Sequence, residues 1–303
     1  MKIVFMGTPD FSVPILKALS ERYEVALVIS QPNRVKKKGQ LIDTPVASLA
    51  KELNLKLIQP EKIKDAYEII KEEEADVLVT AAYGQFVPTK ILKLFHKCLN
   101  VHASLLPLHR GGAPIQRCLM EGDKKTGVTI MEMTKELDAG QMYAHVEYEI
   151  TPGDNATRLF NILSLLGRNL IIDNIEGIVD GSIQGVSQDE SRATVSPNIL
   201  PIEEQIDLNN NAVDVVNKIR GLSYEPGAYL IVNGIKIKIL KATVLDIESK
   251  PGYVVETKKK IVLGCKDKSI ELLEVLYPGK KLMSGKDFSN GQKIFIKDTI
   301  INS

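Results

Sequence analysis

Residues 2–10 read Lys-Ile-Val-Phe-Met-Gly-Thr-Pro-Asp, a short apolar run followed by a turn. Such a run, bounded by Gly and Pro, is typical of a buried parallel strand that leads into a helix. The residues that follow, 11–20, place Val13, Leu16 and Leu19 at helical spacing. The beginning of the sequence therefore predicts a strand–turn–helix unit.

Similar units follow along the chain. The residue pattern predicts strands at 25–30, 56–59, 77–82 and 97–101, and helices at 45–53 and 65–74. Strands that alternate with helices at this spacing indicate an α/β fold with a mainly parallel sheet. The first turn lacks the second and third glycines of G-x-G-x-x-G, so no dinucleotide-binding fingerprint supports an oxidoreductase.

The pattern changes after residue 138. A strand is predicted at 143–150 and a long amphipathic helix at 155–181, with Asp154 as its N-terminal cap. After an irregular polar stretch come a short helix, 213–220, and short strands with a hairpin turn at Asn233-Gly234. The predicted strands span 227–232, 235–242, 252–257, 260–264 and 269–275. Short strands at this spacing favour a small OB-like β-barrel.

These boundaries predict an α/β domain at 1–184, a linker at 185–208 and a C-terminal OB-like domain at 209–303. The 303 residues are 44% hydrophobic and 25% charged, and no apolar run approaches the ~20 residues that cross a bilayer. An early Gly7 and Pro9 argue against a secretory signal. Three scattered cysteines argue against disulfides and a cysteine-based zinc site. We therefore expect a cytoplasmic protein without a membrane segment. The sequence does not give the oligomeric state, and a monomer is the default expectation.

The most informative stretch is Asn-Val-His-Ala-Ser-Leu-Leu-Pro at residues 100–107. It ends a predicted strand, and ligands of open α/β sheets bind at the carboxyl edge. Asn100 and His102 are two residues apart, so both point to one face of the strand. Together they could stabilise an oxyanion, although an isolated histidine is more often a structural residue.

A carboxylate comes from Asp138, which stands before Ala-Gly in a predicted loop. Near His102 it could orient the imidazole or accept a proton. Sequence alone does not bring the two together, and an Asp in such a turn is also an ordinary loop residue.

These motifs in combination resemble the folate-dependent formyltransferase family. The resemblance rests on residues 100–107, Arg-Gly-Gly-Ala-Pro-Ile-Gln at 110–116, Gly-Val-Thr-Ile-Met at 127–131 and Leu-Asp-Ala-Gly at 137–140. It extends to residues 5–11, Gln31-Pro32, 82–84 and Ile206-Asp207. The resemblance implies a Rossmann-like catalytic domain with helices on both faces of the sheet, followed by an OB-like barrel.

The resemblance also implies an activity. Asn100, His102 and Asp138 match the family's catalytic residues, 10-formyltetrahydrofolate is the implied donor, and no metal is implied. The implied folate-binding residues are Ser104, Leu105, Leu106, Pro107, Tyr83 and Gly84. The implied acceptor is the amino group of initiator methionyl-tRNA. Among the four histidines, the sequence shows no close metal-ligand pair.

Positive charge gathers in two places. The segment 33–40 holds Arg34, Lys36, Lys37 and Lys38, and residues 206–303 carry 16 Lys and Arg against 11 Asp and Glu. Such a loop is either a solvated connection or, as the resemblance implies, a surface that docks on tRNA phosphates. Two alternatives stay open: a formyltransferase that acts on a small amine, and a non-catalytic RNA-binding protein with this fold.

Overall fold

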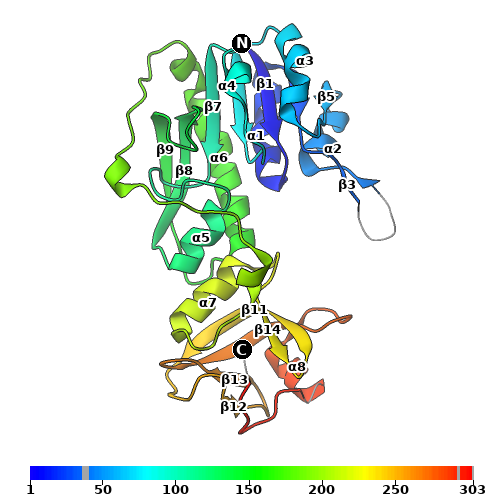
Figure 1. The fold of residues 1–303 in the computed structure, drawn as a ribbon, viewed down its shortest axis with the longest axis vertical. Helices are drawn as coiled ribbons and strands as arrows, with labels where there is room; N and C mark the ends of the chain where they lie inside the picture. Colours follow the sequence, from blue (N-terminus) through cyan, green and yellow to red (C-terminus); the bar gives the residue numbers. More distant parts are fainter. Residues whose placement is uncertain (36–40, 292–293, 302–303) are drawn as a thin grey trace. The chain divides into compact units, whose positions relative to one another are not determined.

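A computed structural model describes residues 1–35, 41–291 and 294–301, and it divides into two compact units (Figure 1). The first unit comprises Met1–Pro114, Lys125–Glu149 and Phe160–Pro197. The second comprises Ile115–Lys124, Ile150–Leu159 and Asn198–Ser303.

A seven-stranded sheet forms the centre of the first unit (Figure 1). Its order is β5 (Leu57–Ile58), β2 (Glu24–Ile29), β1 (Lys2–Gly7), β6 (Val77–Ala81), β7 (Lys97–His102), β8 (Lys125–Glu132) and β9 (Met142–Glu149). The strands from β5 to β7 pair in parallel, whereas β8 and β9 are antiparallel to their neighbours. The prediction of a mainly parallel sheet is confirmed, but β8 was not among the predicted strands.

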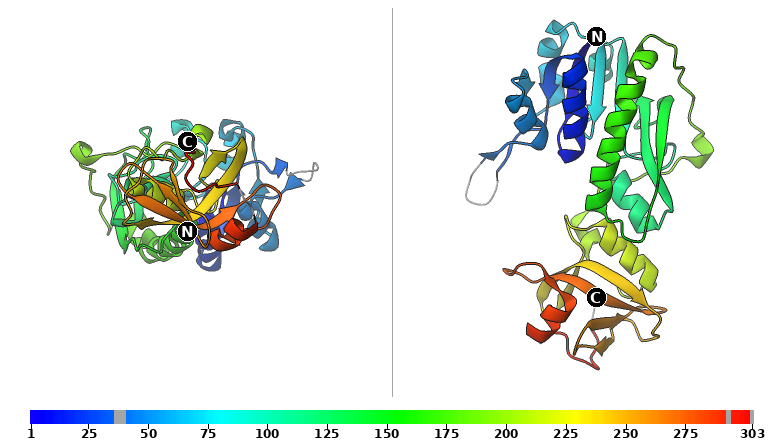
Figure 2. Two further views of the ribbon diagram at one scale, coloured as in Figure 1. Left: turned by 90° about the horizontal axis from the view of Figure 1, so that it is seen from below. Right: turned by 180° about the vertical axis from the view of Figure 1, so that it is seen from behind.

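Helices cover both faces of this sheet, as in a Rossmann-like fold. The helices are α1 (Val13–Arg22), which follows a 3-10 turn at Asp10–Ser12, α2 (Pro45–Glu52), α3 (Tyr67–Glu72), which follows a 3-10 turn at Ile63–Ala66, α4 (Thr89–Leu92) and α6 (Ala156–Val179). In the rear view of Figure 2, α1 and α6 lie in front of the strands. On the opposite face, Val4 and Met6 of β1 pack in one apolar cluster with Ile70 of α3 and Ile91 of α4.

The long helix α6 fits closely against the sheet at Gly167. A Cβ atom there would lie 2.9 Å from Cγ1 of Val101 on β7, so only a glycine allows this approach without a shift. The predicted cap of this helix was wrong by one residue. The Asn155 side chain accepts the N–H of Arg158 at 2.9 Å, while Asp154 accepts from Thr151 and pairs with Arg158.

The second unit is built on a curled antiparallel sheet, which confirms the predicted OB-like architecture (Figure 1). Its strands, in sheet order, are β10 (Tyr229–Val232), β11 (Ile235–Leu245), β14 (Ser269–Leu276), β13 (Ile261–Gly264) and β12 (Val254–Glu256), with β15 (Met283–Ser284) also paired to β14. The helices of this unit are α5 (Pro114–Glu121), α7 (Ala212–Gly221) and α8 (Gly285–Gly291), with a 3-10 turn at Pro201–Glu204.

The core of the second unit is apolar. Val215 and Ile219 of α7 and Phe288 of α8 pack with the inward side chains of the sheet, such as Ile239. The predicted hairpin turn is present, because Val232 pairs with Ile235 across Asn233 and Gly234. Both turn residues have positive φ, 51° and 78°, as a two-residue hairpin turn requires.

Among the residues that the structure describes, no helix has the length and apolar character that a membrane crossing needs. The three cysteines are buried, reduced thiols. Burial raises the pKa of Cys98 and of Cys265 to about 12, so neither is a reactive thiolate at neutral pH.

Candidate active site

Asn100 and His102 lie at the carboxyl end of β7, as predicted. Val101 between them faces Gly167 of α6, so the two polar side chains point to the opposite face of the sheet. His102 is 5% exposed and Asn100 is partly exposed. The strand therefore presents an amide and an imidazole side by side at the edge where α/β sheets bind ligands.

The amide of Asn100 has a defined orientation. Thr80, on the neighbouring strand β6, donates its hydroxyl to Oδ1 of Asn100 at 2.9 Å. Because the carbonyl side of the amide is engaged, its NH₂ group is the side that can donate to another atom. An NH₂ donor at a strand end suits an oxygen that gains negative charge. Sequence reasoning missed Thr80, since its role depends on the pairing of Thr80 with Asn100 across two strands.

The ring nitrogens of His102 have different neighbours. Nε2 lies 2.9 Å from the carbonyl oxygen of His109, which can only accept, so Nε2 carries a proton. Nδ1 lies 3.6 Å from Oδ2 of Asp138. A carboxylate oxygen therefore faces Nδ1, the ring nitrogen that the His109 carbonyl does not engage.

Asp138 lies in the loop between β8 and β9. Its φ angle is +49°, a conformation that Asp tolerates better than most residues. Oδ2 of Asp138 accepts the backbone N–H of Gly111 at 2.8 Å. Gly140 allows the loop to turn, because a Cβ atom there would lie 1.9 Å from the carbonyl oxygen of Glu132. The structure thus brings together Asn100, His102 and Asp138.

The segment 104–107 follows β7 and is held by hydrogen bonds. Ser104 donates to the carbonyl oxygen of Leu108 at 2.6 Å, and the buried Thr129 of β8 donates to the Ser104 carbonyl at 2.7 Å. The Leu106 N–H also approaches the Thr129 hydroxyl, at 3.3 Å. Leu106 and Pro107 are buried and Leu105 is half-buried. The fixed backbone next to His102 could form one wall of a donor site.

Tyr83 and Gly84 follow β6. The Tyr83 side chain is buried in the apolar cluster that covers β1, and burial raises its pKa to about 12. Its hydroxyl has no hydrogen-bond partner among the described residues. Its carbonyl accepts from Thr8 and Gln31, and Gly84 is exposed with a φ of +87°. Of Tyr83 and Gly84, only Gly84 is therefore exposed, and the folate role of both stays a prediction.

Only the base of the basic loop belongs to the described part of the chain. Strands β3 (Arg34–Val35) and β4 (Leu41–Ile42) pair in antiparallel orientation, with Arg34 opposite Ile42. Lys36, Lys37 and Lys38 lie outside the described residues. The assignment of this loop to tRNA stays a prediction.

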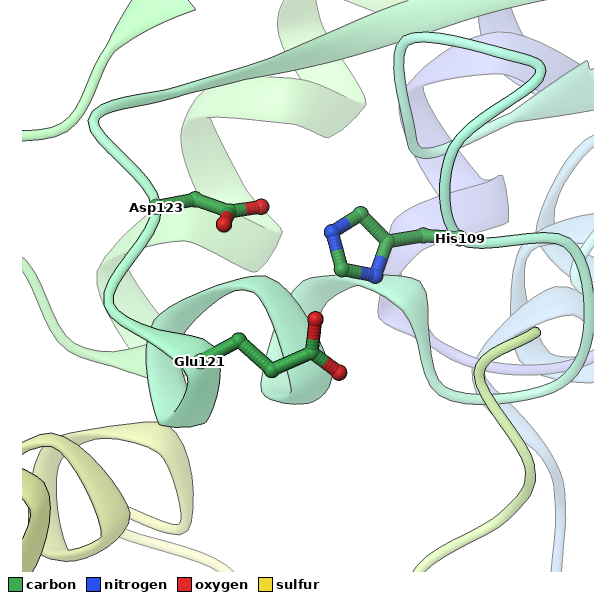
Figure 3. Close-up of side chains that lie close together, drawn as sticks. All are labelled: His109, Glu121 and Asp123. Atoms are coloured by element: carbon green, nitrogen blue, oxygen red, sulfur yellow. The ribbon is translucent and has the colours of Figure 1, made fainter. Parts of the chain in front are cut away.

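Two further acidic residues and a histidine bear on the question of a metal (Figure 3). His109 belongs to the first unit, where its Nδ1 lies 2.7 Å from the Ser196 hydroxyl. Glu121 and Asp123 belong to the second unit. Because the two units are separate bodies, we infer no metal site from these three residues.

Comparison with known proteins identifies the class to which this fold and site belong. The family model described as "Formyl transferase" matches residues 1–175, and the one described as "Formyl transferase, C-terminal domain" matches residues 198–293. Two solved structures share the fold. They are HypX from Aquifex aeolicus in complex with tetrahydrofolic acid, and an N-formyltransferase from Helicobacter canadensis with folinic acid and dTDP-3-aminofucose.

The HypX structure is 17% identical with a TM-score of 0.67, and the match covers 100% of this chain but 51% of HypX, so the chain spans about half its length. The Helicobacter structure is 18% identical with a TM-score of 0.71, and the match covers 90% of this chain and 98% of that one. At these identities the likeness concerns the fold.

Two curated relatives narrow the assignment. A methionyl-tRNA formyltransferase of Lactobacillus acidophilus is 44% identical over 96% of this chain and 95% of its own length. One of Streptococcus mutans is 43% identical over 98% of each. The chain therefore belongs to the methionyl-tRNA formyltransferase family.

Proposed function

We propose that this protein transfers the formyl group of 10-formyltetrahydrofolate to the free amino group of initiator methionyl-tRNA, giving formylmethionyl-tRNA for translation initiation. The observation that carries the proposal is the convergence of Asn100, His102 and Asp138 at one sheet edge, in a chain with full-length relatives of that name. The protein would act in the cytoplasm as a monomer. A small amine as acceptor has no specific structural observation in its favour.

The residues suit the chemistry of formyl transfer. When bound, the folate donor supplies a formyl carbon whose oxygen gains negative charge as the amine attacks. The NH₂ group of Asn100 donates to that oxygen, because Thr80 engages the other side of the amide. The segment 104–107 would hold the donor beside His102.

Proton movement is assigned to the His102–Asp138 pair. The attacking amine must lose a proton once it is bonded to the formyl carbon. The bond between that carbon and the folate nitrogen then breaks, and the nitrogen leaves with a proton as tetrahydrofolate. Asp138 faces Nδ1 of His102 at 3.6 Å, which is too long for a direct hydrogen bond but close enough for a proton to be passed with a small shift or through water. Asp138 therefore acts as the base and holds the imidazole in place.

Formyl transfer to three acceptors tests the proposal. The purified chain is given 10-formyltetrahydrofolate with initiator Met-tRNA, elongator Met-tRNA or free methionine. We expect rapid formylation of the initiator tRNA and much slower reaction with the other two. Equal reaction with free methionine would indicate a small-amine formyltransferase, and no donor consumption with any acceptor would contradict catalysis.

A further inference from the structure

The segment of residues 186–196, here called the strap, pairs with both loops that form the candidate site. It runs past the β9 edge of the sheet, where Val186 and Met142 exchange backbone hydrogen bonds of 2.8 and 2.9 Å (Figure 1). At its other end the Arg110 N–H donates to Thr194 O at 2.9 Å, and Ser196 N donates to Arg110 O at 2.6 Å. The strap therefore connects the Asp138 loop with the loop that follows β7.

Gln188 is the strap residue that contacts the Asp138 loop directly. Its Nε2 donates to the carbonyl oxygens of both Asp138 and Gly140, each at 2.8 Å. Its Oε1 accepts from Nε and Nη2 of Arg110, at 3.0 and 2.8 Å. Both donors and both acceptor positions of this amide are thus used, which fixes its orientation.

Arg110 in turn is held by Glu190. The guanidinium donates to both carboxylate oxygens of Glu190, at 2.9 and 2.7 Å, and only 9% of Arg110 is exposed. A bidentate Arg–carboxylate pair fixes the orientation of the guanidinium as well as its position. The residue after Arg110 is Gly111, whose N–H donates to the Asp138 carboxylate. The Asp138 loop is therefore held at its backbone by Gln188 and at its side chain by Gly111.

From this arrangement we infer that Gln188 is a positioning residue for the candidate base Asp138. Its amide anchors the two carbonyls that flank the turn, so that the Asp138 carboxylate stays opposite Nδ1 of His102. The inference rests on the proposed function, because it concerns the carboxylate that this function uses. Gln188 itself contacts neither His102 nor Asn100 through any hydrogen bond between described residues.

The expected effect follows from the geometry of proton transfer. A displacement of about 1 Å in a reacting group can lower a rate by ~10²-fold. Without the two Gln188 bonds, the carbonyls of Asp138 and Gly140 lose that donor. The loop is then held by the Gly111 N–H at the Asp138 carboxylate and by the Glu132–Gln141 backbone bond at its base. We expect the chemical step to slow by roughly 10- to 100-fold, with little change in substrate affinity.

The first test is Gln188→Glu with Gln184→Glu as matched control. The new carboxylate can still accept from Arg110, but it has no donor for the two carbonyls of the Asp138 loop. Gln184 lies in the same part of the chain, is exposed, and among the described residues its side chain bonds to Gly181 O alone. Single-turnover formylation should fall only in Gln188→Glu, and KM for tRNA and for folate should stay within about twofold. If the glutamate variant does not fold, Gln188→Met replaces it in the test, because it also removes the donor while the Arg110–Glu190 ion pair remains.

The second test separates positioning from general stability. In an Asp138→Asn background, Gln188→Glu should change the residual rate by less than threefold, because a positioning residue acts through the group it positions. If the rate losses of Gln188→Glu and Asp138→Asn multiply in the double variant, the inference is overturned. It is also overturned if Gln188→Glu alone reacts within threefold of an active wild type. A wild-type protein that transfers no formyl group would instead contradict the proposed function.

Discussion

The two units of the molecule differ in the basic side chains that they bury. In the first unit, His102, His109 and Arg110 are at least nine-tenths buried within nine residues of chain, and each is hydrogen-bonded to another loop. In the second unit, the apolar core holds aliphatic side chains, Cys265 and two phenylalanines. Its buried polar residues are acidic or neutral among those described: Asp154, Asn217, Ser223 and Ser269. Burial of polar groups costs free energy unless they are paired, so a protein gathers them where geometry matters. The contrast indicates that the first unit performs the chemistry, while the second contributes a stable surface.

If this contrast is right, the largest effect should come from Asp138. Asp138→Asn keeps the volume and an acceptor for the Gly111 N–H, but it removes the carboxylate that faces His102 and that we propose as the base. The single-turnover rate should fall by ~10²–10⁴ while the thermal midpoint stays close to wild type. A rate within about threefold, which is under ~1 kcal/mol of barrier, would remove Asp138 from the mechanism.

Asn100 should give the next largest effect. Asn100→Ala removes the donor at the strand end, so kcat should fall by roughly 10²–10³ with a smaller change in KM. Thr80→Val sharpens the assignment, because it removes the hydroxyl that orients the amide at 2.9 Å, whose other contacts, to Leu99 O and Met133 Sδ, are longer at 3.3 Å. Loss of one such bond, about 1 kcal/mol, should lower kcat by about fivefold. An unchanged kcat with a much higher folate KM would make Asn100 a binding residue.

A smaller, graded effect is expected where function depends on surface charge. Changing Arg34, Lys36, Lys37 and Lys38 to Ser should raise KM for tRNA. Each lost phosphate contact should reduce the log–log salt slope by roughly 0.7–0.9. Folate affinity is the control and should not change. An equal tRNA KM across a salt series would leave these residues as a solvated connection.

The smallest effect concerns the stability of the second unit. Hydrogen bonds from Arg117, at 2.7 and 3.0 Å, and from the Leu200 N–H lower the pKa of Glu203 from 4.5 to about 2. Because the folded pKa is depressed, this stabilisation is complete above pH 4.5 and is lost as the pH falls towards 2. Solvent screening of the partly exposed pair limits it to on the order of 1 kcal/mol.

Urea unfolding across this pH range measures that contribution. Glu203→Gln should be less stable than wild type at neutral pH, and the difference should shrink as the pH approaches 2. Glu248→Gln, which changes an exposed carboxylate of the same unit, is the control. A difference for Glu203→Gln that does not change with pH would show that the carboxylate charge contributes no stability.

The sequence was most informative where the pattern of side chains repeats. The parallel strands and the small barrel were predicted because their apolar runs and turns are local signals. Strand β8 was missed because Thr126, Gly127 and Thr129 interrupt its apolar run, although residues 126–131 are all buried. The pairing of Thr80 with Asn100 and the 3.6 Å approach of Asp138 to His102 depend on strand register and loop closure, which no local pattern encodes.

The strap illustrates the same limit and has a practical consequence. Its polar, irregular sequence predicted part of a linker, yet its backbone and Gln188 make the contacts that hold the Asp138 loop. A fragment cut after residue 184 would therefore keep Asn100, His102 and Asp138 but lose the segment that orders them. Extending the fragment to residue 197 retains Ser196 and its bonds to His109 and Arg110. For a minimal catalytic fragment, the thirteen residues 185–197, which the sequence presents as a linker, therefore decide whether the Asp138 loop stays ordered and the fragment stays active.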